Sequence, residues 1–295
     1  MLFNALQGVS LRHHNVLTNG VRLHVVEAGP SDGDPVLFLH GFPEFWYGWH
    51  RQIPAFARAG YRVIVPDQRG YYRSEKPPDV DAYRLPELVE DARGLIDATV
   101  REALHVIGHD WGAAVAWALA ARHPSRVRRL GILNVPHPRV MHETVWSDLR
   151  QATRSWYALF FQLPVLPEQL LGAANARGLI QLMRQSSRSG TFSNDDFAIY
   201  RHAWQQPGAI RSMLHWYRAA LRNHALRTVS ADLIEPPTLI IWGRKDVALL
   251  PKMAARSVDR CRDGRLVMID DATHWVQHDA TERVNTLLLD FLGEA

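Results

Sequence analysis

Short apolar runs alternate with longer amphipathic stretches over the first 134 residues. The runs are rich in Val, Ile and Leu, as in strands that are buried on both faces of a sheet. The stretches between them, and one near the C-terminus, have apolar residues at helical spacing and predict helices at 46–59, 85–100, 113–121 and 281–292. Such alternation indicates an α/β fold with a mainly parallel sheet and helices on both faces, with strands at 35–40, 61–66, 104–107 and 127–134.

Two runs with alternating polar and apolar residues precede the first buried strand. One ends at Thr18 and the next begins at Val21, with Asn19 and Gly20 between them. Asn-Gly between alternating runs is a strong signal for a two-residue hairpin turn. We therefore expect an antiparallel pair of strands at the start of the fold.

The alternation of strands and helices stops near residue 136. From there to residue 229 no strand is convincing, and Trp, Tyr, Phe, Leu and Arg recur at helical spacing, with breaks at Pro164, Pro167, Gly190 and Pro207. Strands resume at 237–243 and 266–269. We therefore expect one α/β core, residues 1–135 and 230–295, interrupted by a helical cap, residues 136–229.

Composition and charge narrow the possible functions. The formal net charge is +4 and nearly all the positive charge is Arg, but no basic stripe with a recognition motif is present, so nucleic acid is not an expected partner. The single cysteine, Cys261, excludes an intramolecular disulfide and a Cys-based metal site. No signal peptide and no apolar stretch of about 18 residues is evident, so we expect a soluble, cytoplasmic protein without a membrane partner.

The segment Gly108-His-Asp-Trp-Gly112 follows one of the predicted strands and precedes an Ala-rich helix. This strand–turn–helix context fits the nucleophile elbow G-x-Nuc-x-G, with Asp110 at the position of the nucleophile. Glycines on both sides allow strand and helix to approach closely. A carboxylate that merely caps the helix would also suit this position, so the rest of the chain has to decide between the two.

Two further groups come directly after predicted strands. Asp246 follows the strand at 237–243, and His274 follows the strand at 266–269. The carboxyl ends of parallel strands share one edge of the sheet, and nucleophile, acid and histidine is a known chain order for a catalytic triad. We therefore expect His274 as the base, with Asp246 orienting it. Asn134, at the end of the preceding strand, is an amide, which favours Asp246 as the acid.

The stretch His40-Gly-Phe-Pro43 also follows a strand. We expect the backbone N–H groups of Phe42 and Trp111 to form an oxyanion hole, because Gly41 lets the backbone come close to the elbow. The Phe42–Pro43 peptide bond is predicted to be cis.

Together these motifs resemble the epoxide hydrolase branch of the α/β-hydrolase family. The resemblance covers the chain from about Val21 onward and implies an α/β-hydrolase fold. It also implies two cap tyrosines that bind and protonate the epoxide oxygen, at Tyr157 and Tyr217. The motifs that carry it are His40-Gly-Phe-Pro-Glu-Phe-Trp-Tyr-Gly-Trp49, Asp67-Gln-Arg-Gly70, Gly108-His-Asp-Trp-Gly112, Val135-Pro-His-Pro138, Asp246 and His274.

The chemistry is consistent with this interpretation. An aspartate is already anionic at neutral pH and can displace an oxygen at an sp3 carbon without a base, leaving an ester. The alkoxide that leaves needs a proton, which Tyr157 or Tyr217 would supply, and His274 would then activate water against the ester. No metal and no organic cofactor is required. Phe42, Trp111, Tyr157 and Tyr217 would contact the substrate, a small epoxide with an apolar or aromatic substituent.

Two alternatives remain open at this point. A haloalkane or haloacid dehalogenase would use the same aspartate, although this chain has Phe42 and Trp111 where dehalogenases commonly carry Asn or Arg. A ligand sensor on the same fold would need none of the catalytic groups. The protein is expected to be a monomer or a homodimer.

Overall fold

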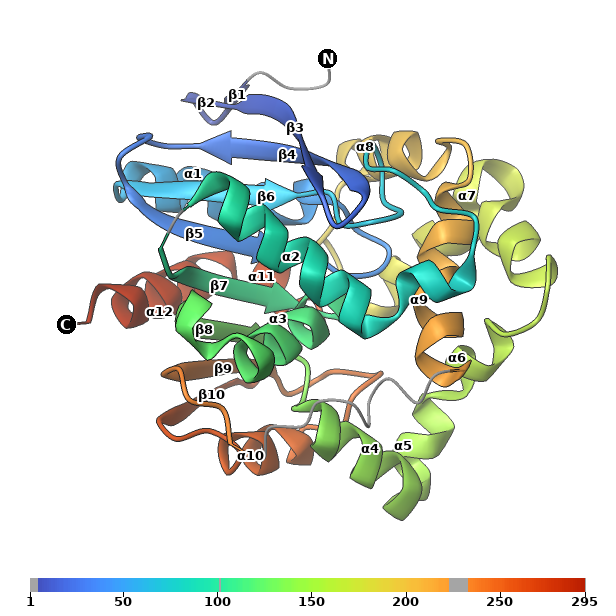
Figure 1. Ribbon diagram of the computed structural model, residues 1–295. Helices are drawn as coiled ribbons and strands as arrows, with labels where there is room; N and C mark the ends of the chain where they lie inside the picture. The colour runs from blue at the N-terminus through green and yellow to red at the C-terminus, as the bar shows by residue number, and fades with distance from the viewer. Residues whose placement is uncertain (1–4, 101, 223–232, 295) are drawn as a thin grey trace.

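The computed structural model describes residues 5–100, 102–222 and 233–294. An eight-stranded sheet crosses the molecule in the order β10-β9-β8-β7-β5-β6-β4-β3 (Figure 1). The six neighbouring strands from β10 to β6 in this order, β5 included, pair in parallel. Strands β3 and β4 are antiparallel to their neighbours, so the predicted mainly parallel sheet is confirmed. The strands are β3 (Arg12–Thr18), β4 (Val21–Ala28), β5 (Asp34–Leu39), β6 (Tyr61–Pro66), β7 (Leu104–His109), β8 (Val127–Leu133), β9 (Thr238–Gly243) and β10 (Gly264–Ile269).

The predicted hairpin joins β3 and β4. Thr18 pairs with Val21, and both turn residues have positive φ, +44° at Asn19 and +74° at Gly20. Asn and Gly tolerate this left-handed backbone better than other residues, which explains the turn sequence. A separate two-stranded ribbon, β1 (Ala5–Leu6) with β2 (Val9–Ser10), precedes the hairpin.

Helices cover both faces of the sheet, as predicted. Figure 1 shows α2 and α3 on the near face, with α1 and α12 on the far face. Helix α3 is apolar almost all round because it packs between the sheet, α2 and α4. The core helices are α1 (Gln52–Arg58), α2 (Leu85–Thr99), α3 (Trp111–Arg122), α10 (Lys252–Val258), α11 (Val276–Asp279) and α12 (Thr281–Gly293), with 3-10 turns η1 (Trp46–Trp49), η2 (Val80–Tyr83) and η3 (Pro124–Arg126).

The prediction of one helix over residues 46–59 was wrong. The chain instead forms η1, turns at residues 50–51 and begins α1 at Gln52. Pro54 explains the break: its ring would clash with the carbonyl of His50 in a continuous helix, but it fits the first turn of a new one.

Between β8 and β9 the described residues form helices and no strand. The breaks expected near Pro164, Pro167, Gly190 and Pro207 are confirmed as helix boundaries. Residues 223–229 of the predicted cap lie outside the described residues. None of the described helices is long and apolar enough to cross a membrane. The inserted helices are α4 (Pro138–Ser147), α5 (Leu149–Arg154), α6 (Trp156–Phe160), α7 (Leu166–Ser186), α8 (Asn194–Trp204) and α9 (Ala209–Arg222).

Candidate active site

Asp110 stands at the sharp turn between β7 and α3. Its backbone has φ +50° and ψ −127°, a strained conformation for a residue with a side chain. The flanking glycines make the turn possible: a Cβ at Gly112 would overlap the backbone carbonyls of Leu39 and His40, and one at Gly108 would lie 2.6 Å from the Cα of Ala113. The elbow geometry predicted from the sequence is therefore present.

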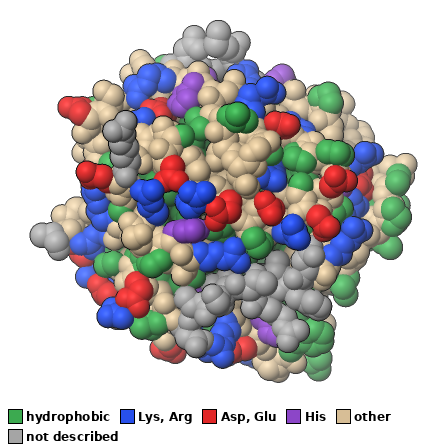
Figure 2. Space-filling model, viewed as in Figure 1, with side chains coloured by type: hydrophobic (Ala, Val, Ile, Leu, Met, Phe, Trp, Pro, Cys, Tyr) green, Lys and Arg blue, Asp and Glu red, His purple; other side chains and the backbone are tan. Residues whose placement is uncertain are grey.

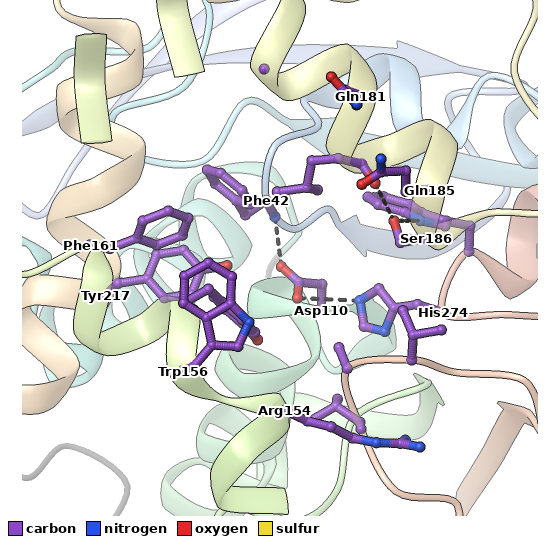
Figure 3. Close-up of a pocket in the computed structure, with 17 residues that line it drawn as sticks. Phe42, Asp110, Arg154, Trp156, Phe161, Gln181, Gln185, Ser186, Tyr217 and His274 are labelled. Atoms are coloured by element: carbon purple, nitrogen blue, oxygen red, sulfur yellow. Dashed lines mark hydrogen bonds and ion pairs between the residues drawn. The ribbon is translucent and has the colours of Figure 1, made fainter. Parts of the chain in front are cut away.

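The imidazole of His274 lies between two carboxylates, and Figure 3 shows the one that belongs to Asp110. Its Nε2 is 3.4 Å from Oδ2 of Asp110, and its Nδ1 is 2.8 Å from Oδ2 of Asp246. The three side chains come from the ends of β7, β9 and β10, as the chain order suggested. The structure thus brings together the three residues predicted as a triad.

The carboxylate of Asp246 is held by three other donors. Its Oδ1 accepts from the backbone N–H groups of Ala248 and Leu249, at 2.8 and 2.9 Å. Its Oδ2 accepts from Nδ2 of Asn134 at 2.8 Å, and Oδ1 of Asn134 accepts from the N–H of Gly243 at 2.8 Å. Asn134 therefore connects the ends of β8 and β9 and helps to fix the carboxylate that contacts His274.

Neighbouring charges raise the pKa of His274 and lower the pKa of Asp110. Burial disfavours the imidazolium of His274, but the charge of Asp246 and hydrogen bonds to Asp110 and Asp246 outweigh burial and raise the pKa of His274 to about 10. Burial acts against the carboxylate of Asp110 too, yet His274 and the N–H of Phe42 lower its pKa. Both shifts favour an ionised Asp110 beside a protonated His274.

Phe42 contributes one of the two predicted oxyanion-hole donors. Its backbone N–H donates to Oδ1 of Asp110 at 2.6 Å, and a Cβ at Gly41 would overlap the Asp110 side chain. The Phe42–Pro43 peptide bond is cis, as predicted. The N–H of Trp111, the other predicted donor, is the first amide of α3 and follows Asp110 directly. Backbone amides at a helix N-terminus favour negative charge.

The two predicted tyrosines pack edge to face and line the same cavities as Asp110. Tyr157 comes from α6 and Tyr217 from α9, and their ring centroids are 5.9 Å apart. The ring of Trp111 packs edge-on against Tyr217 at 5.1 Å. Burial and the negative charge of Asp110 raise the pKa of both phenols above their usual value. Both therefore keep their protons at neutral pH.

Comparison with known proteins identifies the family. The family model described as alpha/beta hydrolase fold matches residues 34–281. Epoxide hydrolase 2 of Caenorhabditis elegans is 37% identical, covering 96% of this chain and 80% of its own length. A crystal structure of a variant epoxide hydrolase from Bacillus megaterium matches with a TM-score of 0.87 and 30% identity, covering 95% of this chain and 100% of that one.

The chain belongs to the epoxide hydrolase branch of the α/β-hydrolase family. A Bacillus subtilis protein named AB hydrolase superfamily protein YfhM is 42% identical, covering 97% of this chain and 99% of its own. These relatives match the chain over both the sheet and the inserted helices.

Two adjoining cavities meet at the candidate catalytic groups of this epoxide hydrolase. The larger is about 520 Å³ and the smaller about 130 Å³, and both are lined by Asp110, Tyr157, Tyr217 and Leu249. The smaller is lined mainly by apolar side chains. The larger has aromatic walls, as the sequence suggested, and also polar groups that it did not indicate: Arg154, Gln181, Gln185 and Ser186 (Figure 3).

A buried polar network behind the elbow was not predicted. Glu44 accepts hydrogen bonds from Tyr200, His278 and Gln277. His109, next to the nucleophile, donates from Nε2 to the carbonyl of His274 at 2.9 Å and accepts from the amide of Gln277. Although burial opposes the charge of Glu44, the neighbouring histidines hold its pKa well below the usual value. The feature of the sequence that could have indicated this network is Glu44, a charged residue within the motif at residues 40–49.

Helix α8 is anchored to the loop that carries Phe42. The indole of Trp204 donates to the carbonyl of Pro43 at 2.6 Å, and Tyr200 donates to Glu44. In the opposite direction, Tyr47 donates to Asp196 of α8 at 2.9 Å. All three hydrogen bonds are buried, so α8 and the loop that carries Phe42 form one packed unit.

Proposed function

We propose that this epoxide hydrolase forms a covalent ester on Asp110 and then hydrolyses the ester to a vicinal diol. The observation that carries the proposal is the placement of an anionic carboxylate and two protonated phenols around the same two cavities. A carboxylate nucleophile opposite two acids suits a strained ether, whose oxygen must be protonated as it leaves.

In the first step, Oδ2 of Asp110 attacks one carbon of the epoxide. The C–O bond of the ring breaks, its electron pair goes to the oxygen, and Tyr157 or Tyr217 donates the proton that converts the alkoxide to a hydroxyl. The resulting tyrosinate regains its proton from solvent. Oδ1 becomes the carbonyl oxygen of the ester and keeps its hydrogen bond from Phe42.

Formation of the ester prepares the second step. The ester is neutral, so His274 loses one of the two negative charges that raise its pKa, and its proton passes to solvent more readily. The neutral imidazole can then take a proton from water, whose oxygen attacks the carbonyl carbon. The N–H groups of Phe42 and Trp111 would stabilise the oxyanion on Oδ1. Collapse of this intermediate releases the diol with a proton from His274.

The aromatic walls of the larger cavity support a substrate with an apolar or aromatic substituent. The Bacillus megaterium relative has been crystallised with its naphthyloxy-propane-diol product, an aryl ether. We propose that residues 136–229 act as the cap that carries Tyr157 and Tyr217 over the core formed by residues 1–135 and 230–295. The cytoplasmic location and the monomeric or homodimeric state stay predictions from the sequence.

The mechanism is tested with a His274→Ala variant, in which the ester should form but not hydrolyse. The variant is incubated separately with styrene oxide and with a haloalkane, and intact mass is measured. We expect an adduct with the whole mass of the epoxide, located on Asp110 by peptide mapping. The matched control is the double variant Asp110→Ala/His274→Ala, which should stay unlabelled. Labelling by the haloalkane alone, with halide released, would instead indicate a dehalogenase.

A further inference from the structure

A basic groove lies on the surface of the inserted helices, outside the candidate active site. It measures about 500 Å³ and runs between α9, the segment from Gln162 to Gln169 and the chain beside η2. Its basic groups are Arg211, His215, Arg218 and Arg222. Their spacing of four, three and four residues places them along one face of α9.

The arginines of the groove differ in how they are paired. Arg218 is buried, and its guanidinium donates hydrogen bonds to both carboxylate oxygens of Glu168 and to the carbonyls of Phe161 and Leu163. Arg211 and Arg222 are exposed, and neither forms an ion pair within the ranges that the structure describes. The rise of an α-helix separates their backbones by about 16 Å. A single small anion cannot easily contact both, whereas an extended anionic surface can.

His215 forms part of the wall of the groove and packs against the ring of Tyr83. Only 5% of the residue is exposed, and neither ring nitrogen has a hydrogen-bond partner among the described residues. Burial and the neighbouring arginines lower its pKa to about 4, so the ring is neutral and offers one N–H. The positive charge of the groove therefore comes from the arginines and not from His215.

An exposed apolar segment adjoins the basic groove. Leu159, Leu163, Val165, Leu166 and Leu170 are each between 44% and 69% exposed. Val165 belongs to this segment and also lines the groove, so apolar and basic groups meet there. Figure 2 shows hydrophobic side chains gathered at the right-hand rim of the molecule, with basic side chains beside them. Leucines this exposed in one short stretch are unusual unless something covers them.

The charge of the inserted helices favours one kind of occupant. Residues 136–222 contain ten arginines, no lysine and five carboxylates, a net formal charge of +5 against +4 for the whole chain. A second copy docked through the same face would bring like charges together. An anionic bilayer would be attracted, with lipid phosphates at the arginines and leucines in the headgroup region.

We propose that the face formed by the α9 groove and residues 159–170 binds the surface of an anionic phospholipid membrane. Lipid phosphates contact Arg211 and Arg222, and the exposed leucines enter the interface. Trp156, which is 62% exposed and lines the larger cavity, lies just before this segment, so the contact brings the cavity near a phase that concentrates apolar epoxides. The expectation of no membrane partner rested on the lack of a spanning segment, which does not bear on surface binding.

The test is co-sedimentation of the full chain with vesicles at low ionic strength. We expect binding to vesicles of phosphatidylglycerol and phosphatidylcholine, and little binding to phosphatidylcholine alone. The double variant Arg211→Gln/Arg222→Gln should bind the anionic vesicles at least tenfold more weakly, because each arginine near such a surface contributes to attraction. Leu163→Ser/Leu166→Ser should also weaken binding.

The matched control removes two positive charges from the core instead of from the groove. Arg244→Gln/Arg262→Gln replaces two exposed arginines of the core, each paired with a carboxylate outside the inserted helices, and should bind as the wild type does. Hydrolysis of a water-soluble epoxide should be unchanged in every variant, which separates this proposal from the catalytic one. The proposal is overturned if anionic vesicles do not bind, if the core control loses as much affinity as the groove variant, or if the groove binds inorganic phosphate but no vesicles.

Discussion

Replacement of Asn134 tests whether the link between the ends of β8 and β9 supports the acid of the triad. Asn134→Gly removes the side chain but leaves a residue that adopts the observed φ of +52° without strain. The hydrogen bond to the ionised Asp246 contributes about 1.5–3 kcal/mol, and the N–H of Gly243 left without a partner costs about 1–3 kcal/mol. We expect the free energy of unfolding to fall by about 3–5 kcal/mol.

Asn134→Ala is the matched comparison. It loses the same two hydrogen bonds and also places a Cβ at a positive φ, which costs about 1–2 kcal/mol, partly offset by the lower entropy of an unfolded Ala. It should therefore be less stable than Asn134→Gly by about 0.5–1 kcal/mol. Both variants should hydrolyse the ester more slowly, since Asp246 holds His274 less firmly.

Urea denaturation measures the stabilities, and stopped-flow tryptophan fluorescence with an epoxide separates ester formation from ester hydrolysis. Trp111 and Trp156 line the two cavities and should report both phases. Ester formation should change little. The reasoning fails if Asn134→Gly unfolds within about 0.5 kcal/mol of the wild type and hydrolyses the ester at an unchanged rate.

Three further predictions concern the elbow and its neighbours. Tyr157→Phe/Tyr217→Phe should abolish ring opening, with a loss of at least about 100-fold, while the melting temperature changes little; full activity would remove the proposed acids. The pKa of His274 is raised in the folded state, so it stabilises the protein below pH 6.5, and this stabilisation is lost as the pH rises toward about 10. Chemical denaturation from pH 6 to 10 should show that slope in the wild type and lack it in His274→Gln. Gly112→Ala should destabilise the protein by more than about 4 kcal/mol, because its Cβ would overlap the carbonyl of Leu39; a folded, active variant by circular dichroism and turnover would contradict this.

The three residues that we propose as the triad could be selected from the sequence because local patterns indicate them. Asp110, Asp246 and His274 each follow an apolar strand, and parallel strands place their carboxyl ends on one edge of the sheet. The hairpin at Asn19 and Gly20 was predictable for a similar reason, since both residues accept the backbone that the turn requires. Tyr157 and Tyr217 were predicted only from the family resemblance, because no local pattern distinguishes them from aromatic residues that pack in a core.

Side chains paired across long distances in the chain could not be predicted. Asn134 and Asp246 are 112 residues apart, and Glu44 and Tyr200 are 156 apart, so no window of sequence contains both partners. The polar groups of the larger cavity were missed because nothing in the local sequence separates Gln181 and Gln185 from solvent-facing residues of a helix. Their effect depends on where α7 packs, which the pattern does not specify.

The hydrogen bonds between α8 and the loop that carries Phe42 limit how far this helix can move to let substrate in or product out. Lifting this helix away would break the hydrogen bonds of Trp204, Tyr200 and Tyr47 together, and two of the three are made to carboxylates. Three such losses cost about 4 kcal/mol or more, so fewer than about one molecule in a thousand would be open on that side. We therefore expect epoxides to reach Asp110 through the larger cavity, whose wall includes the exposed Trp156, without movement of α8.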